Sequence, residues 1–138
     1  MPQISRRCIP YTPNRRPLAE TTVALVTTAG VHLRDQPPFR PEGEKEFRII
    51  PGDVALADLM ITHPYYDHRD ADRDINCVFP LGRLREFAAE GVIAAVSNYH
   101  IGYMGTSPRL REVYEETAPA IADRLERSQA DAVVLTAG

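Results

Sequence analysis

The chain has 138 residues, the length of one domain, since domains cluster near about 100–150 residues. Its composition, 43% hydrophobic and 25% charged, excludes a disordered chain, and its net charge of −3 lacks the basic excess of nucleic-acid-binding proteins. No apolar run approaches the roughly 20 residues that span a bilayer, and the first residues lack the apolar core of a signal peptide, so we expect a cytoplasmic protein with neither membrane nor nucleic-acid partners.

The N-terminal part of the chain is rich in proline. Residues 1–21 contain four prolines among arginines and polar residues, which predicts an extended arm ahead of a single α/β domain at 22–138. Residues 22–28 are β-branched and apolar and end at Ala29-Gly30, which is typical of a strand buried on both faces. Residues 31–51 are too long and too interrupted by prolines for a hairpin connection, which favours a functional loop.

The middle of the chain alternates apolar and polar segments. Residues 58–62 predict a second strand, which is followed at once by a polar cluster at 63–74. Apolar side chains at helical spacing, with Pro80 before them and Gly91 after them, predict a helix at 80–90. Residues 92–96 predict a third buried strand, with a loop at 97–106 after it.

The C-terminal part completes the pattern. Residues 108–127 predict an amphipathic helix that is kinked or divided at Pro119, and residues 130–136 predict a fourth strand. Apolar strands that alternate with helices indicate an α/β fold with a mainly parallel sheet of about four strands and flanking helices, similar to flavodoxin or Rossmann folds.

Polar residues and glycines follow the predicted strands. Ligands of open parallel sheets bind beyond the carboxyl ends of the strands, where backbone N–H groups can approach a carboxylate or phosphate. The same residue types also occur in ordinary turns. The four strand ends are Thr27-Thr28-Ala29-Gly30, Thr62-His63, Ser97-Asn98-Tyr99-His100 and Thr136-Ala137-Gly138.

The cluster at 63–74 combines histidines with carboxylates. Both types bind metals, but the spacing of His63 and His68 fits neither a helix face nor a zinc ribbon, so we expect no metal site. General acid/base chemistry is the more attractive use, because a histidine near a carboxylate titrates close to neutral pH. A loop ordered by hydrogen bonds is the alternative. The acid/base candidates are His63, Asp67 and His100.

The two cysteines offer no nucleophile. Apolar neighbours of Cys77 predict a buried, protonated and unreactive thiol, and Cys8 lies in the arm, a poor place for a catalytic group. The sequence holds no CxxC, P-loop or GxGxxG motif, so the residues alone predict no redox pair and no cofactor in this chain.

Three segments carry a family resemblance: VALVTTAGVHLRDQPPF (23–39), HPYYDHRDADRDINCVFP (63–80) and LREFAAEGVIAAVSNYHIGYMG (84–105). Together they resemble the selenoprotein B subunits of the glycine/sarcosine/betaine/D-proline reductase family, most closely its D-proline branch. The resemblance covers about residues 8–138 and implies reductive cleavage of a C–N bond α to a carboxylate in a small amino acid.

The resemblance also implies partners and a pocket. In the family a pyruvoyl group on a partner subunit activates the amine, a selenolate displaces nitrogen, and a dithiol reductant restores the enzyme, so we expect a heteromeric, oligomeric complex. Combined with the strand ends, the resemblance implies a substrate pocket with these residues: Thr27, Thr28, Gly30, His63, Tyr66, Asp67, His68, His100, Tyr103, Met104, Gly105, Thr136 and Gly138.

The family pattern departs from this sequence at the C-terminal end. In the family the strand corresponding to Asp131–Thr136 leads into an element with selenocysteine or cysteine, so we expect the nucleophile just after residue 138. A UGA codon read as stop, or a short subunit completed by another chain, would each account for this, and both leave the fold incomplete at its C-terminus. The alternative function is a noncatalytic assembly or small-ligand-binding subunit that keeps the fold without the redox element.

Overall fold

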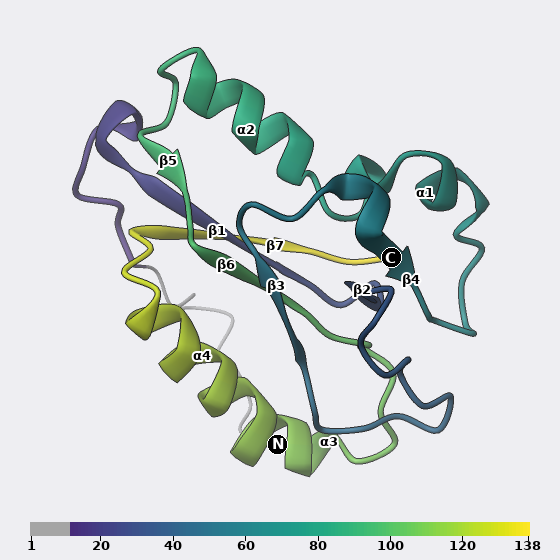
Figure 1. Ribbon diagram of the computed structural model, residues 1–138. Coiled ribbons are helices and arrows are strands. Elements are labelled where there is room, and N and C mark those ends of the chain that lie inside the picture. The colour runs from purple at the N-terminus through teal and green to yellow at the C-terminus, as the bar shows by residue number, and fades with distance from the viewer. Residues whose placement is uncertain (1–11) are drawn as a thin grey trace.

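The computed structural model describes residues 12–138 (Figure 1). Residues 1–11, which include Cys8 and most of the arm predicted at 1–21, lie outside the described residues. The part of that arm that is described contains a short 3-10 helix at Leu18–Glu20, just ahead of the first strand. The division into arm and domain stays a prediction.

One mixed sheet forms the centre of the molecule. Strand β1 (Thr22–Thr27) pairs in parallel with β5 (Ala95–Val96) and β6 (Tyr99–Gly102) on one side and with β7 (Ala132–Thr136) on the other. Strand β3 (Arg48–Pro51) then joins β6 in the antiparallel direction. The α/β class is confirmed, whereas a mainly parallel, flavodoxin-like or Rossmann-like sheet is not confirmed, because the sheet is mixed.

Two further strands form a separate two-stranded sheet. Strands β2 (Val31–Leu33) and β4 (Leu59–Ile61) pair antiparallel, so the strand predicted at 58–62 exists but lies outside the main sheet. Gly30 makes this departure possible. Its φ of +78° is in the left-handed region, and a Cβ there would lie 2.3 Å from the Thr62 carbonyl oxygen.

The third strand begins later than the sequence predicts. Val92 is exposed in a turn, and the ladder runs through β5 and β6 with an interruption at Ser97-Asn98, so β6 occupies part of the predicted loop 97–106. The turn after β3 causes the interruption, because the Gly52 N–H donates to the Asn98 carbonyl over 2.7 Å. Any side chain at Gly52 would collide with the Ser97 carbonyl.

Helix α2 (Leu81–Ala89) covers one side of the sheet and confirms the helix predicted at 80–90 (Figure 1). Its Leu81 and Leu84 are buried against a core that includes Leu25, Phe79 and Ile93. Three short elements precede it: a 3-10 helix at Leu56–Asp58, α1 (Arg69–Arg73) and a 3-10 helix at Ile75–Cys77.

The other side of the sheet is covered by the helical segment predicted at 108–127. It consists of α3 (Leu110–Glu112), a π-helical turn (Val113–Thr117) and α4 (Ala118–Arg127). The division predicted at Pro119 therefore lies just before that residue, where the missing proline N–H removes a ladder donor. Tyr99 of β6 donates its hydroxyl proton to the Arg124 carbonyl and ties α4 to the sheet.

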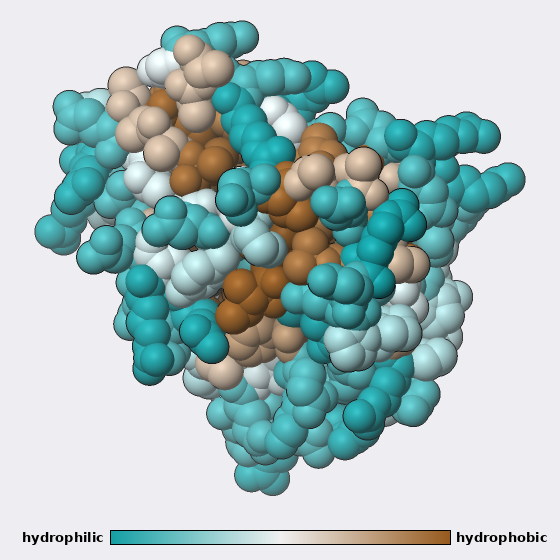
Figure 2. Space-filling view, viewed as in Figure 1, coloured by the Kyte–Doolittle hydropathy of each residue, from teal (hydrophilic) through white to brown (hydrophobic). Residues whose placement is uncertain are grey.

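The face seen in Figure 2 is mostly hydrophilic, with apolar side chains gathered in its middle. Edge strand β7 adds exposed apolar side chains, of which Leu135 is 74% exposed. Within residues 12–138, no helix combines the length and apolar character needed to cross a membrane.

Candidate functional site

The tips of β1, β6 and β7 meet, as the strand-end argument predicts. The Thr28 N–H donates to the Thr136 carbonyl over 3.0 Å, and the Gly105 N–H donates to the Thr28 carbonyl over 2.9 Å. The Gly30 N–H donates to the Tyr103 carbonyl over 2.8 Å. The structure therefore brings Thr28, Gly30, Gly105 and Thr136 into one patch.

Two hydroxyls beneath this patch serve the fold. Thr27 and Thr136 both donate to the Val78 carbonyl, over 3.0 and 2.6 Å. Thr27 is fully buried and its oxygen also accepts the Ala29 N–H, so its single donor is used within the fold. Met104 is also fully buried, and its backbone forms an isolated antiparallel β-bridge with Ala29.

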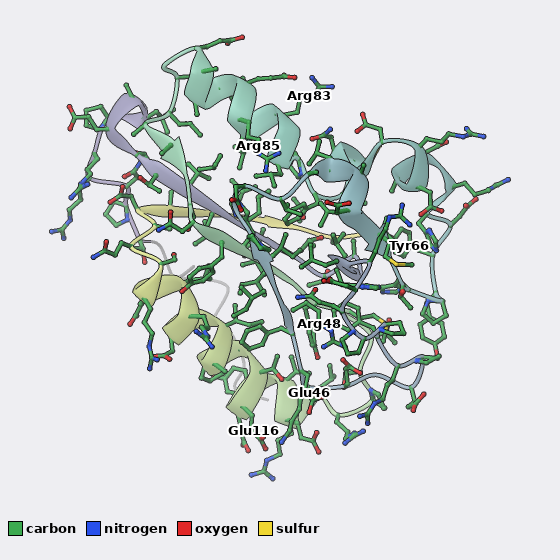
Figure 3. All side chains as sticks on the ribbon, in the orientation of Figure 1. Glu46, Arg48, Tyr66, Arg83, Arg85 and Glu116 are labelled. Atoms are coloured by element: carbon green, nitrogen blue, oxygen red, sulfur yellow. The ribbon has the colours of Figure 1, made fainter. Side chains whose placement is uncertain are left out.

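Tyr66 lies beside the tip of β7, next to β4 (Figure 3). Its hydroxyl donates to the Ala29 carbonyl over 3.0 Å. A Cβ at Gly138 would lie 2.5 Å from the Tyr66 ring, so a side chain at position 138 would require that ring to move. Burial raises the pKa of Tyr66 to about 12, with a smaller contribution from Asp72, so the phenol remains a proton donor at neutral pH.

Two histidines flank Tyr66, and we call His63, Tyr66 and His68 the His–Tyr–His cluster. The ring centroid of Tyr66 lies 4.8 Å from that of His63 and 5.5 Å from that of His68. His68 donates its Nδ1 proton to Asp72 over 2.8 Å, which fixes the orientation of the ring. The cluster combines a neutral phenol donor with two imidazoles.

His63 is the member of the cluster best suited to move a proton. Its Nδ1 accepts the Tyr65 N–H over 3.3 Å, so the neutral ring carries its proton on Nε2. Burial lowers its pKa from the usual value, and the nearby His68 lowers it further. At neutral pH the His63 ring is therefore uncharged and can donate a hydrogen bond from Nε2, and it can give up a proton only after it has taken up a second one.

Asp67 lies between Tyr66 and His68 in the chain, but its carboxylate is engaged by Arg69. It is exposed and forms an ion pair with Arg69, in which both carboxylate oxygens accept from the guanidinium. These hydrogen bonds from Arg69 lower the pKa of Asp67. Asp67 thus orders the loop, which is the alternative that the sequence left open for this segment, and its catalytic role stays a prediction.

His100 lies apart from the cluster, in the core beneath α2. Its Nδ1 accepts the Leu25 N–H over 3.0 Å, at the gap that the Ser97-Asn98 interruption leaves in the ladder. Its ring meets Phe79 edge-on at 5.8 Å and is fully buried. Burial, and to a lesser extent Arg85, lowers its pKa to about 4. In Figure 3, Arg85 extends from α2 toward the turn after β3, where it donates to the Gly52 and Val54 carbonyls.

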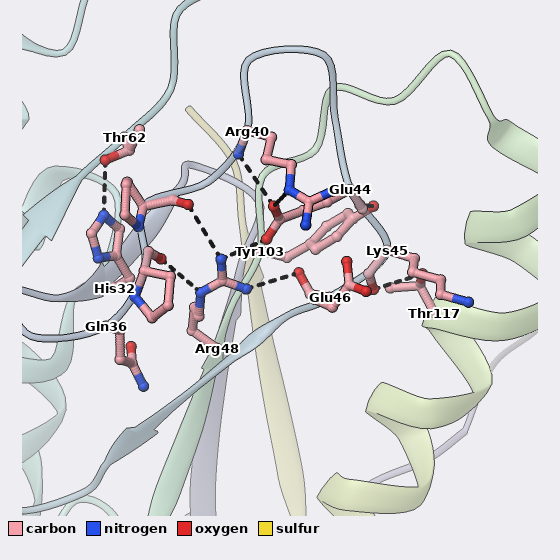
Figure 4. Close-up of polar contacts among 12 residues, drawn as sticks. His32, Gln36, Arg40, Glu44, Lys45, Glu46, Arg48, Thr62, Tyr103 and Thr117 are labelled. Carbon is pink, nitrogen blue, oxygen red and sulfur yellow. Dashed lines mark hydrogen bonds and ion pairs between the residues drawn. The ribbon is translucent and has the colours of Figure 1, made fainter.

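Tyr103 points away from the cluster toward the loop 34–47. Its hydroxyl donates to the Glu44 carbonyl over 2.8 Å, and the Glu44 carboxylate pairs with Arg48 over 2.5 Å (Figure 4). The Arg48 guanidinium also lies 4.3 Å above the ring of the buried Phe39. This buried ion pair holds the proline-rich loop against the tip of β6.

Sequence reasoning missed His32, which is buried between this loop and the cluster. Its Nδ1–H donates to the Leu33 carbonyl over 2.7 Å, so its Nε2 accepts the Thr62 hydroxyl proton over 2.8 Å (Figure 4). Thr62 directly precedes His63. The one available signal was a polar residue between Val31 and Leu33 in an apolar run, which does not reveal a partner 30 positions away.

The prediction that Cys77 is buried is wrong, because its side chain is exposed. The 3-10 helix at Ile75–Cys77 turns Val78 and Phe79 inward and Cys77 outward. Across residues 12–138, no group of three or more histidine, cysteine or acidic side chains is arranged to hold a metal ion.

Comparisons with known proteins identify relatives of the chain. The model of the family "glycine/sarcosine/betaine reductase selenoprotein B" matches residues 1–138. D-proline reductase subunit gamma of Acetoanaerobium sticklandii is 44% identical over 128 residues. Glycine reductase complex component B subunit gamma of Carboxydothermus hydrogenoformans is 31% identical over 142 residues. Sarcosine reductase complex component B subunit beta of Peptoclostridium acidaminophilum is 31% identical over 112 residues.

These matches confirm the resemblance read from the sequence. They cover 93%, 99% and 77% of this chain, but only 53%, 32% and 25% of the three relatives in the same order. The chain thus spans about half the length of the D-proline reductase subunit and a third or less of the other two. No solved structure was found to match the chain.

Proposed function

The chain belongs to the glycine/sarcosine/betaine reductase selenoprotein B family, and on that premise we propose that it is part of a D-proline-reductase-like enzyme that reductively cleaves a C–N bond α to a carboxylate. The observation that carries the proposal is the 44% identity with D-proline reductase subunit gamma over 93% of this chain. Its relatives are subunits of reductase complexes, which supports work within a heteromeric complex. The proposal includes a cytoplasmic location, where dithiol reductants are maintained.

The geometry at the tip of β7 supports the proposed position of the nucleophile. Gly138 lies against the ring of Tyr66, and the two histidines of the cluster flank that ring. A residue that follows Gly138 would therefore emerge beside the His–Tyr–His cluster. Open parallel sheets place their ligands at this same end of the strands.

The proposed reaction draws on groups outside residues 1–138: a pyruvoyl group on a partner subunit to activate the amine, and a selenolate or thiolate just after residue 138 to displace nitrogen, restored by a dithiol reductant. Within this chain, His63 would act as the general acid: its ring takes up a second proton from solvent and, as the imidazolium, passes one proton to the departing nitrogen and returns to the neutral form. Tyr66 remains protonated and orients the reacting groups, because its pKa of about 12 keeps it from acting as a base at neutral pH. His68, held by Asp72, supports the other side of the cluster.

The first test reads the gene beyond codon 138. We expect an in-frame UGA or cysteine codon followed by further α/β coding sequence. The complete subunit, produced with its pyruvoyl-type partner, should then reduce at least one of D-proline, glycine, sarcosine or betaine with dithiothreitol. The 138-residue chain with the same partner should show no turnover, because neither of its cysteines follows β7, where the proposed nucleophile would be.

The same experiment distinguishes a reductase subunit from the alternative, a noncatalytic assembly subunit. A chain that binds the partner subunit without turnover, and whose gene lacks a following selenocysteine or cysteine codon, would be a noncatalytic assembly subunit. Turnover by the 138-residue chain that is lost in Cys77→Ser would overturn the placement of the nucleophile.

A further inference from the structure

Strand β7 forms an open edge of the main sheet. It pairs with β1 from Ala132 to Thr136, and within residues 12–138 no other strand pairs with it. The strand contains no charged residue and no proline, which are the usual protections of a free edge. The backbone groups of β7 that point away from β1 are therefore available to a further strand.

The opposite edge, strand β3, is protected by the preceding loop. The Gln36 side chain donates to the Ile49 carbonyl of β3 over 2.9 Å, and the Arg48 side chain donates to the Pro37 carbonyl over 3.0 Å. The strand also ends at Pro51, which has no N–H to offer to a neighbour. The sheet is thus protected against extension at β3 and open to it at β7.

Apolar side chains of β7 are exposed on both faces of the sheet. Leu135 is in register with Val26, on the face where Tyr99 contacts α4. Val134 is in register with Leu25, on the face covered by α2. Leu135 is 74% and Val134 is 39% exposed, although their neighbours on β1 are buried. A helix against one face would leave the other uncovered, so this edge fits a further strand whose side chains extend over both faces.

The connection that leads into β7 indicates how the sheet would continue. Strands β6 and β7 are parallel and lie on opposite sides of β1, and the chain crosses between them through α4, on the side opposite to α2 (Figure 1). Connections between parallel strands of one sheet are almost always right-handed. A parallel strand at the free edge of β7 would continue in the same direction across the sheet. Its connecting helix would therefore lie on the α4 face, over Leu135.

We propose that β7 pairs with a parallel strand from the segment that follows residue 138 in the complete subunit, and that the helix between the two strands covers Leu135. The inference rests on the proposed function, which places such a segment there. This chain spans about half the length of D-proline reductase subunit gamma. A subunit of that length has ample room for the connection, because a parallel crossover needs only a dozen or more residues.

This continuation would complete the site at the strand tips. The chain that leaves β1 turns toward α2, since Ala29 and Val31 belong to the core beneath that helix. The chain that leaves β7 would turn to the opposite face. Adjacent parallel strands whose connections depart to opposite faces leave a crevice between their tips, which is where open α/β sheets bind ligands. Thr28 and Thr136 lie at the base of this crevice, and the segment after β7 would form its second wall.

Amide hydrogen exchange in the 138-residue chain and in the complete subunit tests the pairing. Amides of β7 that point away from β1 should exchange at least about 100-fold more slowly in the complete subunit, because the added strand accepts their hydrogen bonds. The amides of α3, which begin a helix and have no partner within it, are the control and should exchange rapidly in both proteins.

Two exposed leucines provide matched variants. Leu135→Lys and Leu110→Lys alter side chains that are 74% and 62% exposed in the 138-residue chain. In that chain each change should shift the unfolding equilibrium by less than about threefold, as measured by urea unfolding. In the complete subunit Leu135→Lys should raise the unfolded fraction at least about tenfold, because the proposed helix would bury the new charge. Leu110→Lys should again have little effect.

The inference would be overturned by β7 amides that exchange equally fast in both proteins, or by equal effects of the two lysine variants in the complete subunit. A 138-residue chain that is a dimer in light scattering, with slow exchange in β7 that Leu135→Lys abolishes, would assign the edge to a second copy and would also overturn it. A gene without coding sequence after codon 138 would do the same.

These outcomes are separate from those of the proposed function. A complete subunit with a protected β7 supports the pairing even if its complex shows no turnover, or if its gene continues without a selenocysteine or cysteine codon. A complex that reduces D-proline while β7 remains open would overturn the pairing and leave the proposed function intact.

Discussion

The interior of the main sheet and the tips of its strands are held together in different ways. In the interior, Leu25, Phe79 and Leu81 are fully buried, and the His100 ring supplies an acceptor where the ladder is interrupted. At the tips, backbone hydrogen bonds join the strands, and the side chains above them, including His63 and Tyr66, remain partly exposed.

This difference shows how histidine serves the fold at one position and is available for chemistry at another. Burial lowers the pKa of His100 and keeps its ring neutral. The Nδ1 atom of this ring accepts the Leu25 N–H, so His100 stabilises the sheet. Within residues 12–138 the His63 side chain forms a hydrogen bond through Nδ1 only, so its Nε2–H remains available to other partners. Position relative to the strand end therefore separates a structural histidine from one available for chemistry.

The first prediction tests whether the tips also depend on a buried contact. Glu44→Ala should lower the free energy of unfolding by about 3–5 kcal/mol, because it leaves the charge of the nearly buried Arg48 guanidinium without its carboxylate, with only backbone carbonyls as acceptors. Urea unfolding would measure this loss. Glu116→Ala, which breaks the neighbouring but exposed Lys45–Glu116 pair, is the control and should change little. An equally small effect of both changes would show that loop 34–47 is not anchored by the Arg48–Glu44 pair.

The second prediction concerns the interior alone. Leu84→Ala should cost about 2–5 kcal/mol of unfolding free energy, because it leaves a cavity between α2 and the sheet. Phe87→Ala on the same helix is the comparison, since Phe87 is 45% exposed and should lose less. If Phe87→Ala proved the more damaging of the two, the buried face of α2 would be misassigned.

Local patterns predicted those elements whose burial is visible in a short window. Strands at 22–27 and 132–136 and the helix at 81–89 follow from apolar runs and helical spacing. Strands β2 and β3 were hidden in the proline-rich segment 31–51, because each is short and is defined by pairing with distant residues. Strand β6 was missed since it contains polar residues that the fold buries.

The gathering of the strand tips could be predicted from topology, and the individual side chains could not. Thr28, Gly30, Gly105 and Thr136 meet because neighbouring parallel strands end together. His100 was expected at a strand end, but the interruption at Ser97-Asn98 moves it into the middle of the ladder. His32 and Arg34 gained their positions from contacts with Thr62 and Ala57, which no spacing rule reveals.

The third prediction is a dependence of stability on pH that originates in the interior. The folded pKa of His100 is about 4, below the unfolded value of 6.5, so the unfolded chain binds more protons between these values. The contribution of His100 to the free energy of unfolding is therefore at its full value above about pH 6.5. It falls as the pH drops toward 4, by at most about 3 kcal/mol. His32 and His63, whose pKa values burial also lowers, act in the same direction.

Urea unfolding at a series of pH values would measure this slope. His100→Asn keeps an acceptor for the Leu25 N–H and removes the titrating group, so the acid slope should become shallower even if the variant is less stable throughout. An unchanged slope would place the acid sensitivity in other groups and would weaken the contrast between the two regions.

The last prediction has the smallest effect on stability and addresses the tips. His63→Ala should change the free energy of unfolding by less than about 1 kcal/mol, because the side chain is only half-buried and lies outside the apolar core. In the complete subunit assembled with its partner, the same change should lower kcat about 100-fold, as expected for the loss of a general acid. His63→Gln, which retains a hydrogen-bonding side chain, should restore structure around Tyr65 but not the pH dependence of kcat. Proportional losses of stability and turnover in His63→Ala would instead make His63 a structural residue like His100, and the distinction between interior and tips would no longer hold.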